Sequence, residues 1–132
     1  MKVIVDTDVW SEAFRKPKGK ESRHVKLLKE LILDSRVQMI GMIRFEILSG
    51  IRELERFEKF SKSLEAFPDK PLETSTYILA AKFLNLCRKN GIQGSLTDFI
   101  ICSCSVEWRA SILTKDKDYS LYSKYLPIEL IV

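Results

Sequence analysis

The chain has few of the residues that build disulfide-stapled, thiolate-metal or membrane-spanning proteins. Its 132 residues include three cysteines, one histidine, five glycines and four prolines. An odd cysteine count in a chain of this length indicates free, buried thiols and excludes a disulfide framework. No charge-free apolar run approaches the roughly 18 residues of a membrane-spanning helix. The start of the chain meets an acid at Asp6, too early for a signal peptide, so we expect a cytoplasmic protein without a membrane span.

Several catalytic motifs are also missing. There is no G-x-S-x-G, no GK[ST] and no cysteine beside the single histidine, so the chain offers no nucleophile of the serine, cysteine or P-loop enzymes. His24 lies among lysines at the start of a predicted helix and is not expected to bind metal.

The bulk composition predicts one soluble globular domain over residues 1–132. The chain is 45% hydrophobic and 30% charged, long enough to bury a core and too short for a second domain. The net charge of +4 and the pI near 9.0 favour an anionic partner.

Strand and helix patterns alternate along the sequence. Apolar runs predict short strands at 2–6, 36–40, 111–114 and 128–132. Helical spacing predicts helices from about Val9 (capped by Thr7 or Asp8), at 22–33, 42–50, 54–64, 75–89 and from Asp98 to about Trp108 (capped by Thr97). Because no hairpin signal separates the strands, we expect an α/β fold with a parallel sheet covered on both faces.

Acidic residues border apolar segments at four separated points, namely Asp6, Glu46, Asp98 and Asp116. Asp6 and Asp116 follow predicted strands, whereas Glu46 and Asp98 lie in the early turns of predicted helices. The carboxyl ends of parallel strands and the N-termini of crossover helices share one edge of a sheet. The sequence therefore predicts that these four side chains are neighbours.

Four carboxylates in one pocket cannot all ionise unaided, so either some are protonated or cations are present. Two unit charges about 4 Å apart repel by about 4 kcal/mol at an effective dielectric near 20. Carboxylate oxygens without a histidine or cysteine cluster select Mg²⁺ or Mn²⁺. These ions lower the pKa of a bound water and stabilise a leaving oxygen, so the cluster indicates phosphodiester hydrolysis.

The segments that carry these acids resemble those of the PIN-domain nucleases, above all the VapC-type toxins of toxin–antitoxin pairs. The similar segments are Asp6-Thr7-Asp8-Val9-Trp10, Ile43 to Gly50, Thr97 to Ile101 and Leu113 to Tyr119. They follow in the family's order over essentially the whole chain.

The resemblance implies a three-layer, Rossmann-like PIN fold and a Mg²⁺-dependent (or Mn²⁺-dependent) endoribonuclease. Asp6, Glu46 and Asp98 would be metal ligands, Asp116 the fourth acid, and Thr114 a supporting hydroxyl. The implied partners are RNA, a VapB-type antitoxin and a second copy in a homodimer.

Some assignments stay open. Asp118 competes with Asp116 as fourth acid, and Asp8 is a secondary acid that would reach metal through water. Arg44 either contacts substrate or pairs with a nearby acid. Three residues of the basic loop are candidates for binding substrate phosphate: Arg15, Lys16 and Lys18. An apolar stripe of the helix at 54–64 belongs either to the core or to an interface with a partner: Leu54, Phe57, Phe60 and Leu64.

Two other functions compete with the nuclease. A PIN-like module could bind RNA or protein without catalysis, although a retired site has no need for a cluster of like charges. Asp6-Thr7-Asp8 after a buried strand also resembles the haloacid-dehalogenase phosphatases, in which Asp6 would be a covalent nucleophile.

Overall fold

A computed structural model describes residues 1–15 and 19–131. The strands are β1 (Val3–Val5), β2 (Val37–Gln38), β3 (Ser111–Leu113) and β4 (Leu130–Ile131). The helices are α1 (Thr7–Phe14), α2 (Arg23–Leu33), α3 (Gly41–Ser49), α4 (Leu54–Leu64), α5 (Thr74–Lys89), α6 (Leu96–Trp108) and α7 (Asp118–Tyr122). Over the described part of the chain, none of the helices is both long and apolar enough to cross a membrane.

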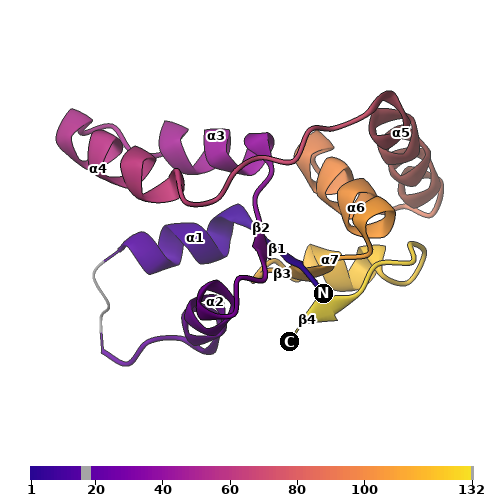
Figure 1. Cartoon of the computed structure of the whole chain (residues 1–132). Helices are drawn as coiled ribbons and strands as arrows, with labels where there is room; N and C mark the ends of the chain where they lie inside the picture. Colours follow the sequence, from indigo (N-terminus) through magenta and orange to yellow (C-terminus); the bar gives the residue numbers. More distant parts are fainter. Residues whose placement is uncertain (16–18, 132) are drawn as a thin grey trace.

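The strands form one parallel sheet in the order β2-β1-β3-β4. Val3 lies beside Val37 on one neighbour and beside Ser111 on the other. Every residue of β1 and β3 is buried, as expected for central parallel strands covered on both faces. Figure 1 shows α1 to α4 on one side of the strands and α5 and α6 on the other. The predicted α/β architecture with a short parallel sheet between helices is confirmed.

The helices α5 and α6 pack along each other, and α6 packs against β3 of the sheet. The Ser103 hydroxyl of α6 donates to the Thr76 carbonyl oxygen of α5 at 2.6 Å, which satisfies a polar group inside this packing. Cys87, Cys102 and Cys104 are free and buried, as the sequence predicted. Burial raises the pKa of Cys104 to about 12, so this thiol packs as an apolar group.

Two helices begin earlier than the sequence predicted. Helix α1 begins at Thr7 with Asp6 as its cap, and α6 begins at Leu96 with Ser95 as its cap. The Ser95 hydroxyl oxygen accepts from the Asp98 amide at 3.1 Å. An N-cap residue needs an extended backbone, and Asp6 and Ser95 have ψ values of 156° and 158°. Thr97, expected as a cap, lies inside α6 instead.

The predicted stripe on α4 has two environments. Leu64 is 1% exposed and belongs to the core, whereas Leu54 at the other end of the helix is 69% exposed. Between them, Phe60 stacks on Phe14 of α1 with ring centroids 4.2 Å apart. The stripe therefore fixes α4 to the domain at one end and leaves an apolar side chain in solvent at the other.

Candidate active site

Asp6 lies where β1 ends and α1 begins, and it is 8% exposed. Its Oδ1 accepts from the Thr7 amide at 2.8 Å, which caps α1. Its Oδ2 accepts from the Thr114 hydroxyl at 2.7 Å. Because Thr114 follows β3, the neighbouring strand, these bonds hold the Asp6 carboxylate at the carboxyl ends of the two central strands.

Two threonines that bond Asp6, Thr7 through its amide and Thr114 through its hydroxyl, connect it to two other predicted site residues. The Thr7 hydroxyl donates to Glu46 Oε1 at 2.7 Å, which brings an exposed side chain of α3 to the start of α1. The Thr114 hydroxyl accepts from the Asp116 amide at 3.0 Å while it donates to Asp6. The role of Thr7 was missed from the sequence, although its place directly after the first acid is a signal for it.

Asp98 on α6 accepts from two phenols of α7. The Tyr119 hydroxyl donates to Oδ1 at 3.3 Å, and the Tyr122 hydroxyl donates to Oδ2 at 2.6 Å. Both tyrosines are 0% exposed. Sequence reasoning did not identify either tyrosine, because 21 and 24 residues separate them from Asp98.

The carboxylates lie within one another's electric field. Burial, with the charges of Asp8 and Asp98, raises the pKa of Asp6 to about 7. Burial also raises the pKa of Asp8, and the charge of Asp116 adds to it. Burial and the charges of Asp6 and Asp98 raise the pKa of Tyr119, so its phenol stays protonated as a donor. These couplings show that the fold gathers Asp6, Asp8, Asp98 and Asp116 in one region.

The donor set suits a hard divalent cation, because it consists of carboxylate and hydroxyl oxygens. Within residues 1–15 and 19–131, no three aspartate, glutamate, histidine or cysteine side chains stand close enough to hold one metal ion together. A cation shared by three of these acids therefore requires side-chain movement, for which the exposed Glu46 has room.

Asp116 and Asp118 differ in their surroundings. Asp116 is half-buried, its Oδ1 accepts from the Asp118 amide at 2.9 Å, and its charge acts on Asp8. Asp118 is exposed at the first position of α7. Asp8 accepts from the Lys115 amide at 3.1 and 3.3 Å, which attaches α1 to the loop after β3. The charge of Asp116 thus acts on Asp8, whereas both charges act on Tyr122, the partner of Asp98.

The basic candidates are spread over the fold. Arg44 pairs with Asp69 at 3.0 Å and also donates to the Leu64 and Phe67 carbonyl oxygens, so its guanidinium joins α3 to the loop after α4. Of the two roles open to Arg44, the structure shows the ion pair. Arg15 is exposed at the end of α1. Lys16 and Lys18 lie outside the described residues.

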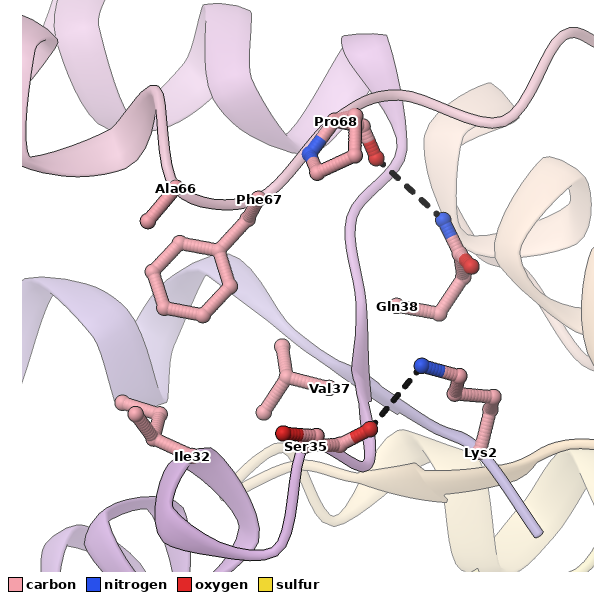
Figure 2. Close-up of a pocket in the computed structure, with 8 residues that line it drawn as sticks. All are labelled: Lys2, Ile32, Ser35, Val37, Gln38, Ala66, Phe67 and Pro68. Carbon is pink, nitrogen blue, oxygen red and sulfur yellow. Dashed lines mark hydrogen bonds between the residues drawn. The ribbon is translucent and has the colours of Figure 1, made fainter.

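A hollow of about 300 Å³ lies elsewhere, beside the edge strand β2 (Figure 2). It is lined by Lys2, Ile32, Ser35, Val37, Gln38, Ala66, Phe67 and Pro68. Figure 2 shows an apolar wall on one side and two hydrogen-bonded polar side chains on the other. Since no carboxylate side chain lines it, this hollow is separate from the acidic site.

Comparisons with known proteins identify the family. A model of the PIN domain matches residues 3–125. No curated protein sequence matches the chain. Similar solved structures include FitAcB from Neisseria gonorrhoeae, with a TM-score of 0.77 and 17% identity over 98% of this chain and 96% of that chain. Another is VapBC2 from Rickettsia felis bound to a promoter DNA fragment, with a TM-score of 0.76 and 15% identity over 99% and 98%.

A third is DNA-bound VapBC from Salmonella typhimurium, with a TM-score of 0.75 and 16% identity over 99% of this chain and 97% of that chain. At such identities these structures show a shared fold, whereas the domain match extends from β1 to just beyond α7. The resemblance seen in the acidic segments is confirmed, and the chain belongs to the PIN-domain family.

Proposed function

We propose that the chain is a Mg²⁺-dependent (or Mn²⁺-dependent) endoribonuclease that acts as the toxin of a VapBC-type toxin–antitoxin pair. The observation that carries the proposal is the connected set of polar groups at the carboxyl ends of β1 and β3. It runs from Glu46 through Thr7 to Asp6 and on through Thr114 to the Asp116 amide. Membership of the PIN-domain family and the likeness to VapBC and FitAB structures support it.

Asp6, Glu46, Asp98 and Asp116 would hold the cation, with Asp8 as a secondary acid. When bound, the cation supplies an acidic water and charge stabilisation at the scissile phosphate. The chain's own part is to fix the ligands: two donors hold Asp6, and two phenols hold Asp98. Of the other two acids, Asp116 accepts from the Asp118 amide, and Glu46 is held by one hydroxyl and can adjust to the cation.

The partners follow from the same assignment. RNA is the proposed substrate, and the net charge of +4 favours such a polyanion. A VapB-type antitoxin is the proposed regulator, because the similar structures include VapBC from two bacteria. We place the protein in the cytoplasm as a homodimer, with the exposed Leu54 end of α4 as one apolar surface for a partner.

Asp6→Asn and Asp98→Asn test the function directly. Each keeps the shape of the side chain and removes one charge, so Mg²⁺-dependent RNA cleavage and growth arrest on expression should both disappear. Asp34→Asn, at an exposed aspartate that ends α2, is the matched control and should keep both activities. If either site variant still cleaves RNA and arrests growth, the assignment is wrong.

Calorimetric titration with Mn²⁺ separates the nuclease from a non-catalytic PIN-like module. The nuclease should bind Mn²⁺, and Asp98→Asn should weaken that binding. A folded wild-type protein that binds RNA but not Mn²⁺ would support the module instead. Trapping of a phosphoaspartate at Asp6 would instead support a phosphatase, for which family membership gives no grounds.

A further inference from the structure

The phenol of Tyr122 makes the shortest hydrogen bond to Asp98. Its hydroxyl donates to Oδ2 at 2.6 Å, whereas Tyr119 donates to the other carboxylate oxygen at 3.3 Å. Both rings are removed from solvent, so water does not replace these donors. The carboxylate therefore has one phenol on each oxygen, and the bond to Tyr122 is the stronger by length.

The packing around Tyr122 leaves its ring little freedom. The ring lies 5.0 Å from Phe99 and 5.2 Å from Tyr119, measured between centroids. On a further side the backbone of Gly94 approaches the phenol: a Cβ there would overlap the Tyr122 hydroxyl and lie 2.8 Å from Cζ. It would also lie 3.0 Å from Cε2 of Phe99.

Gly94 has no left-handed backbone that would demand glycine, since among the described glycines positive φ occurs at Gly19 and Gly91. What requires glycine at position 94 is the close approach of the Tyr122 hydroxyl. Any side chain at this position would displace the phenol or the backbone. The loop before α6 is thus shaped to admit the group that binds Asp98.

Two donors fix the rotation of a carboxylate, because each oxygen offers about two acceptor positions and loses one to its phenol. The remaining positions of Asp98 are free for a cation. Without the Tyr122 hydroxyl, the Asp98 carboxylate can turn about χ2. The carboxylate must then be ordered when the cation binds, and this lowers the affinity for the cation.

We propose that Tyr122 is a positioning residue that orients Asp98, and that Gly94 provides the space in which its phenol does so. The proposal rests on the proposed function, since it takes Asp98 to be a ligand of the cation. Tyr119 is a weaker second donor to the same carboxylate.

The test is Mn²⁺ affinity, measured by calorimetry on the whole chain. Tyr122→Phe removes one oxygen atom and should raise the Kd for Mn²⁺ by about 10- to 100-fold, as is typical when a partner of a metal ligand is lost. Tyr119→Phe should raise it less. Tyr77→Phe, which removes an exposed phenol on α5, is the matched control and should leave the Kd unchanged.

Cleavage kinetics give a second readout. At limiting Mn²⁺, Tyr122→Phe should lower kcat for RNA and leave KM for RNA unchanged, and excess Mn²⁺ should restore kcat. A loss of kcat that excess Mn²⁺ leaves in place, in a variant that melts like the wild type, would overturn the positioning role.

Asp98→Asn distinguishes this proposal from the one it rests on. If Asp98→Asn abolishes Mn²⁺ binding and Tyr122→Phe binds like the wild type, the role of Tyr122 is wrong and the nuclease assignment stands. If Asp98→Asn binds Mn²⁺ normally, the proposed function itself fails.

Gly94→Ala tests the second half of the proposal. By moving the phenol, it should weaken Mn²⁺ binding as Tyr122→Phe does, and the two changes together should cost little more than one alone. Additive losses of affinity would show that Gly94 does not act through Tyr122. Since Tyr122→Phe adds no atoms, it tests the role of Tyr122 even if Gly94→Ala folds poorly.

Discussion

The two ends of the parallel sheet differ in the partners of their charged side chains. At the amino ends, the chain's own carbonyl oxygens accept from Lys2 at 2.9 Å and from Arg36 at 2.8 Å. At the carboxyl ends, no ion pair within the described residues involves Asp6, Glu46 or Asp98. The cationic side chains at the amino ends have backbone acceptors, whereas the carboxylates at the carboxyl ends raise one another's pKa and keep a negative charge that a bound cation would offset. That contrast supports the proposal of a functional site at the carboxyl ends.

The largest expected effect is on the stability of the metal-free protein as pH changes. Because the pKa of Asp6 is raised from 3.8 to about 7, the folded state is penalised when this carboxylate ionises. The penalty is absent below the unfolded pKa, grows as pH rises from about 4 to 7, and reaches up to about 4 kcal/mol above pH 7. Asp6→Asn should remove it. Relative to the wild type, the variant should therefore gain stability between pH 4 and pH 8 in urea unfolding with EDTA.

Added Mn²⁺ is the control for this prediction. The cation should stabilise the wild type at pH 8 and leave Asp6→Asn little changed, because only the wild type has the full charge that binds it. If the stability difference between the two proteins is the same at pH 4 and pH 8 without metal, the ionised Asp6 carboxylate does not destabilise the folded state, and the prediction is wrong.

Glu46→Gln should lower RNA cleavage by about 100-fold, in the range expected for the loss of one electrostatic group from an active site. Glutamine can still accept from the Thr7 hydroxyl, so the 2.7 Å contact and the fold should persist. Glu58→Gln, at an exposed glutamate of α4, should cleave RNA like the wild type. Equal activities of the two variants would mean that α3 contributes no charge to the site.

The sequence predicted the architecture because alternating strand and helix patterns without hairpin signals are compatible with few topologies. In a parallel sheet, the loops that follow the strands all lie at the carboxyl edge. That reasoning also brought Asp6, Asp98 and Asp116 to the same region. It did not resolve which polar residue caps each helix. Ser95 and Thr97 are both good caps, and the path of the preceding loop decides which one has the extended backbone.

Tyr119 and Tyr122 show a second kind of information that the sequence lacks. Their bonds to Asp98 depend on how α7 packs on α6 and join residues more than twenty positions apart. In a pattern of apolar spacing, both tyrosines look like ordinary core aromatics. The sequence likewise does not show why position 94 needs glycine, because the reason is the approach of Tyr122, 28 residues later, rather than the local backbone.

Asp116 and Asp118 form a matched pair two residues apart. Asp116→Asn should lower cleavage by about 10-fold, because Asp116 is half-buried and its charge reaches Asp8. The variant keeps the Oδ1 that accepts from the Asp118 amide, so α7 should start unchanged. Asp118→Asn, at an exposed side chain, should stay within about twofold of the wild type. The reverse ranking would make Asp118 the fourth acid.

The smallest effect is expected away from the carboxylates, in the hollow of Figure 2 beside the edge strand β2. Gln38→Ala removes hydrogen bonds to the Met39 and Pro68 carbonyl oxygens at 2.9 and 3.4 Å, and should cost about 1 kcal/mol in urea unfolding. RNA cleavage and the Kd for Mn²⁺ should not change, because no carboxylate lines this hollow. A tenfold loss of cleavage in a stable Gln38→Ala protein would show that RNA also contacts this hollow. The difference between the two ends of the sheet would then no longer support a site at the carboxyl ends alone.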